Sequence, residues 1–93
     1  MSKPTVVNNP EASRYEISVD GVLAGFVDYV DEGEVLVMPH TEVFDGFEGQ
    51  GLAAILVTGA LDDVRANHRV VRPDCPYIAR FLGKNPAYQN LVA

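Results

Sequence analysis

The feature that most restricts the fold is a change of hydrophobic period across the glycine-rich stretch from Gly46 to Ala54. Before this stretch, Arg14 to Val19 has apolar residues at every second position, which is typical of a half-buried strand. After it, apolar residues between Gly49 and about Asn67 recur at helical intervals with charged residues between them, which predicts an amphipathic helix. The sequence therefore predicts a sheet that runs directly into a helix, with the glycines at the junction.

Turn residues complete the predicted topology. Asp20-Gly21 and the segment Asp31 to Gly33 are expected turns, and they separate the β-rich runs Val22 to Val30 and Glu34 to Met38 from the first strand. Three antiparallel strands in a meander follow from this pattern. The other expected elements are an edge strand (Thr5 to Asn8), a strand (His68 to Arg72), a helix opened by Pro76 (Ile78 to Leu82) and a short last turn that starts at Pro86.

Length, composition and charge limit the function. The chain has 93 residues, of which 47% are hydrophobic and 22% charged, so we expect one folded domain over residues 1–93. The formal net charge of −6 disfavours nucleic acid and anionic membranes as partners. Five of the seven basic residues nevertheless lie between Arg65 and Lys84, where a small anionic ligand could be received. The single cysteine permits no internal disulfide, and no signal or membrane-spanning run is visible, so we expect a cytoplasmic protein.

The glycine-rich stretch has a chemistry of its own. A loop that enters a helix presents unpaired backbone N–H groups and the positive end of the helix dipole, which suits a phosphate or pyrophosphate. Small residues at Gly49, Gly51 and Ala53 would let such a ligand approach the backbone closely. The alternative is that these glycines only turn the chain. Neither a P-loop nor a dinucleotide-binding fingerprint is present.

Four motifs together resemble a compact branch of the GNAT superfamily of N-acetyltransferases. They are His40-Thr41-Glu42-Val43, Gly46 to Ala53, Pro73-Asp74-Cys75-Pro76-Tyr77 and Asn85-Pro86-Ala87-Tyr88. The resemblance implies a reduced GNAT fold of the α/β (α+β) class, with a mostly antiparallel, mixed sheet of about five strands, one long helix and one or two short C-terminal helices. It also implies acetyl-CoA as cosubstrate and an amine acceptor that stays unidentified. No Cys/His/Asp cluster has metal-ligand spacing, so no metal is expected.

The same resemblance assigns the turn to the coenzyme A pyrophosphate. The cofactor-binding residues that it implies are Val43, Glu48, Gly49, Gln50, Gly51, Leu52, Ala53, Ala54 and Asn85. The sequence departs from the family pattern at Glu48, where the family has Arg or Gln. A carboxylate close to the ligand would repel it by about 4 kcal/mol at 4 Å and an effective dielectric constant of 20.

Three residues are candidates for catalysis. Cys75 lies between Pro73 and Pro76, so its thiolate would be stabilised at a helix N-terminus, and the resemblance implies that it is a candidate acetyl carrier. The alternative is a buried structural thiol. His40 and Glu42 lie two apart on an expected strand, so they share a face and could form a general-base pair, or they could be structural only.

Two other function classes stay open. The first is a non-catalytic module that binds an acyl-CoA or a protein partner with the same fold. The second is a redox-sensing thiol protein, which would depend on Cys75 alone. Tyr77, Phe81 and Tyr88 could line a ligand cleft, although the spacing of Tyr77 and Phe81 also suits a core-facing helix stripe. The sequence does not determine the oligomeric state.

Overall fold

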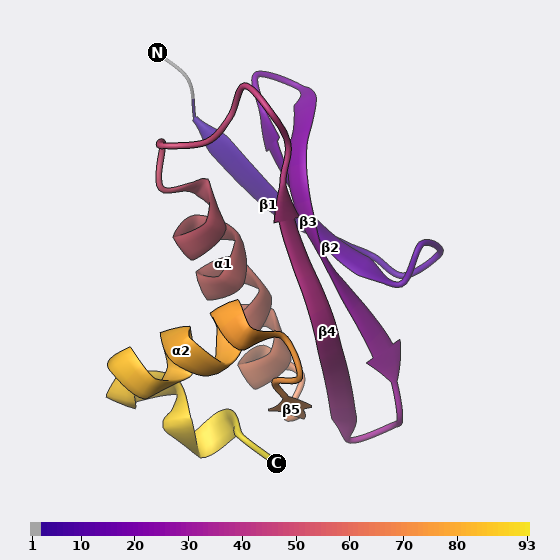
Figure 1. The fold of residues 1–93 in the computed structure, drawn as a ribbon. Coiled ribbons are helices and arrows are strands. Elements are labelled where there is room, and N and C mark those ends of the chain that lie inside the picture. The colour runs from indigo at the N-terminus through magenta and orange to yellow at the C-terminus, as the bar shows by residue number, and fades with distance from the viewer. Residues whose placement is uncertain (1–2) are drawn as a thin grey trace.

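A computed structural model describes residues 3–93 and contains one five-stranded mixed sheet (Figure 1). The strands lie side by side in chain order, and the first four are antiparallel while the last pair is parallel. The mostly antiparallel, mixed sheet predicted from the sequence is therefore confirmed. The strands are β1 (Pro4–Asn9), β2 (Arg14–Val19), β3 (Val22–Asp31), β4 (Val35–Val43) and β5 (Val70–Arg72).

Two helices and a final 3-10 helix complete the chain: α1 (Leu52–Ala66), α2 (Pro76–Lys84) and η1 (Pro86–Leu91). Figure 1 shows α1 and α2 on the same side of the sheet, and within residues 3–93 no helix covers the opposite face. No helix in this part of the chain is long and apolar enough to cross a membrane. The predicted order of strands, long helix, strand and short helix is confirmed.

Two predicted boundaries are wrong, for physical reasons. The helix α1 begins at Leu52 rather than near Gly49, because Gly49 and Gly51 adopt positive φ angles of 78° and 71° that do not continue into a right-handed helix. The β-rich run expected to end at Met38 and the strand expected to carry His40 and Glu42 form one strand, β4, which extends to Val43 because the chain absorbs Pro39 within an irregular part of the ladder.

The core lies between the sheet and α1. The alternating residues of β2, namely Tyr15, Ile17 and Val19, are all buried, as their period predicts. Tyr15 also donates a hydrogen bond from its hydroxyl to Oδ2 of Asp63 at 2.6 Å, which ties α1 to the sheet. Helix α1 buries one stripe against these strands, formed by Leu52, Leu56, Val57, Ala60, Leu61 and Val64.

A bulge in β4 decides which side chains face the helices. Asp28 pairs with His40 and Val30 pairs with Val37, so an advance of two residues along β3 corresponds to three residues along β4. The extra residue reverses the alternation of side chains. Met38, within the bulge, is fully buried in the core, whereas His40, two residues later, is exposed.

The strand β5 is too short to cover β4. It pairs with β4 only over Val35 to Val37, and Pro73 then turns the chain away. In the described chain, the remaining edge of β4 has no strand neighbour on this side, and the carbonyl of Met38 accepts the N–H of Cys75 at 2.9 Å. An open edge therefore runs from the bulge toward the glycine-rich turn.

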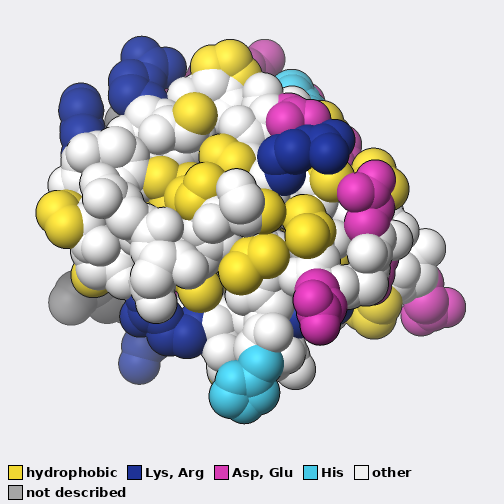
Figure 2. All heavy atoms as spheres, turned by 90° about the horizontal axis from the view of Figure 1, so that it is seen from below, with side chains coloured by type: hydrophobic (Ala, Val, Ile, Leu, Met, Phe, Trp, Pro, Cys, Tyr) yellow, Lys and Arg dark blue, Asp and Glu magenta, His cyan; other side chains and the backbone are white. Residues whose placement is uncertain are grey.

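The lower end of the molecule in Figure 1 is formed by η1, β5 and the β3–β4 turn. Seen from below, hydrophobic side chains gather near the centre of this end, with acidic and basic side chains around them (Figure 2). The C-terminal segment lies along β5, because the N–H of Ala93 donates to the carbonyl of Val71 at 2.8 Å.

Candidate functional site

A cavity of about 270 Å³ lies at the start of α1. Gly51 occupies the N-cap position, and no side chain of the described residues accepts a hydrogen bond there. The first turn of α1 also contains no acidic residue. The N–H groups at this helix start are therefore available to an anion, and the helix dipole favours one. The cavity is lined by Val43, Phe47, Glu48, Gly49, Gly51, Leu52 and Ala53.

The predicted cofactor-binding residues divide into three groups. Val43, Glu48, Gly49, Gly51, Leu52 and Ala53 line the cavity, so the structure brings these six together. Gln50 and Ala54 are exposed in the same segment but do not line it. Asn85 lies at the end of α2, away from this cavity, and borders a second hollow. The role of each residue in binding stays a prediction.

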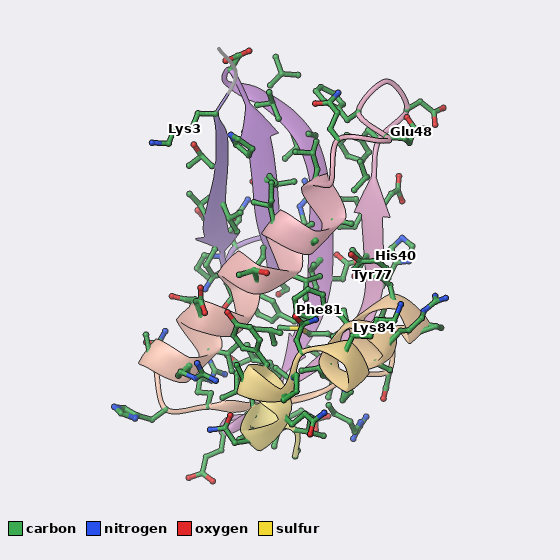
Figure 3. The ribbon with its side chains drawn as sticks, turned by 90° about the vertical axis from the view of Figure 1, so that its left-hand side faces the viewer. Lys3, His40, Glu48, Tyr77, Phe81 and Lys84 are labelled. Atoms are coloured by element: carbon green, nitrogen blue, oxygen red, sulfur yellow. The ribbon has the colours of Figure 1, made fainter. Side chains whose placement is uncertain are left out.

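The Glu48 carboxylate folds back onto its own loop. Its Oε1 accepts the N–H of Gly46 at 2.7 Å, and backbone N–H groups of Glu48 itself and of Gly46 lower the pKa of this carboxyl group. Figure 3 shows Glu48 extending from the tip of the loop, away from the helices. The charge is thus held on the Gly46 side of the turn, so its repulsion of a ligand at the start of α1 is weaker than a direct contact would give.

Cys75 is the N-cap residue of α2 and is only 5% exposed. Its Sγ lies 3.5 Å from Oγ1 of Thr41. Burial by itself raises the pKa of the thiol, but hydrogen bonds from Thr41 and from the backbone N–H groups of Ile78 and Tyr77 outweigh it, so the pKa lies below its ordinary value. The helix start predicted around this cysteine is confirmed, with Pro76 as the first helical residue.

His40 and Glu42 do share one face, as their spacing predicts. Nε2 of His40 lies 3.2 Å from Oε1 of Glu42, and both side chains are about half exposed. Their cross-strand partners, Asp28 and Phe26, alternate with the buried Val27, so the pair lies on the sheet face opposite α1. Cys75 and its neighbour Thr41 lie on the helix side, and the candidate catalytic residues are therefore separated by the sheet.

A second hollow, of about 320 Å³, lies along α2. Nδ2 of Asn85 donates to the carbonyl of Phe81 at 2.7 Å, and the Phe81 ring lies 6.1 Å from that of Tyr88. The rings of Phe81 and Tyr88 pack against the edge of the core. Phe81 also borders the hollow, together with Tyr77. Of the three aromatic residues expected at a ligand cleft, Tyr77 and Phe81 border this hollow and Tyr88 does not line it, and a ligand-binding role of the hollow stays a prediction. The hollow is lined by Tyr77, Arg80, Phe81, Lys84 and Asn85.

Sequence reasoning missed one residue of the site. Thr41 is not among the predicted catalytic or cofactor-binding residues, yet its hydroxyl is the side-chain partner of Cys75. The two residues lie 34 positions apart, so no local pattern could have connected them. Within residues 3–93, no group of three or more His, Cys, Asp or Glu side chains is placed to hold a metal ion.

Comparisons with known proteins agree with this geometry. A family model described as GCN5-related N-acetyl-transferase matches residues 14–91. Protein NATD1 from Bos taurus is 36% identical over 64 residues, which are 69% of this chain and 56% of that protein. Human NATD1 is 34% identical over the same length. The chain thus spans little more than half of the curated relatives that it matches.

Solved structures show the same fold. The solution structure of a GCN5-like protein from Staphylococcus aureus superposes with a TM-score of 0.71 at 19% identity, covering 96% of this chain and 87% of that one. Ard1 from Thermoplasma volcanium gives a TM-score of 0.59 at 22% identity, covering 77% and 53%. Together with the matched family model, the open edge of β4 and the cavity at the start of α1 place the chain in the GCN5-related N-acetyltransferase family.

Proposed function

We propose that this chain is an acetyl-CoA-dependent N-acetyltransferase that transfers the acetyl group to an amine. The observation that carries the proposal is the cavity at the start of α1, where uncapped N–H groups lie beside Val43 at the end of the open edge of β4. Backbone donors there suit the pyrophosphate of coenzyme A. Backbone groups along the part of the β4 edge that has no strand neighbour in the described chain suit the amide-containing arm that leads to the thioester.

Direct attack by the amine is the route that we favour. The amine nitrogen forms a bond to the acetyl carbonyl carbon, the carbon–sulfur bond breaks, and the coenzyme A thiolate leaves. His40, hydrogen-bonded to Glu42, takes the proton that the amine loses. This pair is exposed on the open face of the sheet, where an acceptor can arrive without passing the helices that cover the other face.

A route through Cys75 is the second possibility, because the pKa of its thiol is lowered. In that route the thiolate takes the acetyl group and then passes it to the amine. Because Cys75 is almost fully buried, we expect intact-mass analysis after incubation with acetyl-CoA to show no acetylated protein, and Cys75→Ser to keep most of the turnover. An acetyl adduct on the wild type that is absent from Cys75→Ser would establish the covalent route instead.

Ligand-induced stabilisation tests binding itself. Acetyl-CoA at 100 times its dissociation constant stabilises a folded protein by about 2.7 kcal/mol, so a clear rise in the melting temperature is expected. Transfer is then measured with a panel of amines by the release of free coenzyme A thiol. Stabilisation without any product would favour a non-catalytic acyl-CoA-binding module. That alternative is supported by the face that carries His40, which no helix of residues 3–93 covers. No stabilisation at all would contradict both.

The charge at Glu48 gives a separate prediction. Glu48→Arg should tighten acetyl-CoA binding by about threefold to tenfold, because it replaces a weak repulsion with attraction at an exposed position. Glu11→Arg makes the same change of charge in the turn between β1 and β2, and should leave the affinity unchanged. Titration calorimetry on both variants measures the difference. Equal tightening in the two would show that only the net charge matters.

A further inference from the structure

Five basic residues lie between Arg65 and Lys84, and three of them are already engaged. Arg65 donates to the carbonyl of Ala87 and contacts the Tyr88 ring, and Arg69 forms an ion pair with Asp31. Arg72 pairs with Asp74 at 3.3 Å.

The other two, Arg80 and Lys84, form no ion pair or side-chain hydrogen bond with any residue of the described range 3–93. Both are exposed, and both border the hollow along α2. Since unpaired cations that border one cavity attract an anion into it, the hollow favours a negatively charged ligand.

The other walls of the hollow are aromatic and polar. Tyr77, Phe81 and Asn85 are spaced by four residues, so they form one stripe of α2 beside the two cations. Aromatic side chains offer a stacking surface to a planar base, and guanidinium and ammonium groups bind phosphate. A purine nucleotide combines both chemistries, and the volume of about 320 Å³ accommodates a group of that size.

The glycine-rich turn leaves the charge of a coenzyme A molecule uncompensated. The segment from Gly46 to Ala54 contains no Lys or Arg and one acidic residue, Glu48. Its backbone donors can hold the pyrophosphate, yet coenzyme A carries a further phosphate on the 3′ oxygen of its ribose. Positive charge for that phosphate would come from another element, and Arg80 and Lys84 are the two of the five clustered cations that no contact of the described residues engages.

The two hollows lie on the same side of the sheet. Figures 1 and 3 show the loop before α1 and the helix α2 on the same side of the sheet. In Figure 3 Tyr77, Phe81 and Lys84 lie along α2, below the first turns of α1. We propose that the α2 hollow binds the adenosine 3′-phosphate end of acetyl-CoA, with Arg80 and Lys84 pairing with the 3′-phosphate. This inference rests on the proposed function.

The test compares acetyl-CoA with its 3′-dephospho form by titration calorimetry. The wild type should bind the dephospho ligand about tenfold or more weakly, because the 3′-phosphate carries close to two charges near pH 7. The variant Arg80→Gln/Lys84→Gln should lose about tenfold in affinity for acetyl-CoA and almost none for the dephospho form. Lys3→Gln removes an exposed charge on the β1 side of the sheet and should change neither affinity.

The outcomes separate the inference from the proposed function. Equal affinity of the wild type for both ligands, or equal weakening of both by the double variant, overturns the α2 assignment while acetyl-CoA binding stands. Failure of the wild type to bind either ligand overturns both. Because Arg80 and Lys84 are exposed and unpaired, the double variant should keep the melting temperature of the wild type, which confirms that it is folded.

Discussion

Replacing Gly25 with alanine should lower the free energy of unfolding by about 2 kcal/mol or more. A Cβ atom at this position would collide with the carbonyl oxygen of Glu42 and would lie 3.1 Å from Cα of Val43. Both are backbone atoms of β4, so no side-chain rotation relieves the contact and the two strands have to separate. Urea denaturation of the variant and the wild type measures the loss.

The separation of β3 and β4 in Gly25→Ala should also disturb the candidate site. Gly25 pairs with Val43, which lines the cavity at the start of α1, so we expect weaker acetyl-CoA binding by the folded variant. Gly83→Ala is the matched control, because a Cβ there meets nothing within 4 Å and the residue is part of α2. It should be neutral or stabilise the protein by up to about 1 kcal/mol. Equal stability of the two variants would show that β3 and β4 are not held as closely as described.

Replacing Ala53 with aspartate should weaken acetyl-CoA binding on the order of 100-fold, because it puts a carboxylate at the helix start proposed to hold the pyrophosphate. Ala53 is partly buried and lines the cavity, so an acidic side chain there competes with the ligand for the same N–H groups. The fold should not suffer, since a negative charge in the first turn of a helix is stabilising by about 0.3–1 kcal/mol. Loss of binding with unchanged or higher stability is the expected signature.

Ala54→Asp supplies the control. Ala54 follows in the same helical turn but is exposed and does not line the cavity. It gives the same charge and the same favourable interaction with the helix dipole, and it should weaken binding several times less than Ala53→Asp. Calorimetric titration gives the affinities, and thermal unfolding gives the stabilities. If the two variants bind equally well, the cavity at the start of α1 is not where the anion lies.

Most elements could be predicted from local pattern. The alternation of Tyr15, Ile17 and Val19 and the proline at the start of α2 act over a few residues, so they are readable before folding. The continuity of β4 past Met38 was not readable, because Pro39 looks like a strand terminator unless β4 itself can absorb it in a bulge. The start of α1 depended on the φ angles of Gly49 and Gly51, which the glycines permit but do not require.

The candidate site, like the fold, has some features that local sequence predicts and others that depend on tertiary contacts. That His40 and Glu42 share a face follows from their spacing of two, since side chains alternate along any strand. Which face they share depends on the bulge, which puts them on the face of the sheet that points away from Cys75. The contact between Cys75 and Thr41 joins two segments that only the folded sheet and α2 bring together.

By itself, the sequence determined the order of the elements, the glycine-rich junction between sheet and helix, and the motifs that indicated the family. Those properties arise from residue types and short periods, which act along the chain. Only the tertiary structure decided that Glu48 folds back onto Gly46, that three of the five clustered cations are engaged, and that Arg80 and Lys84 border one hollow. Such facts depend on which distant groups meet, and packing of the whole sheet against its helices settles that.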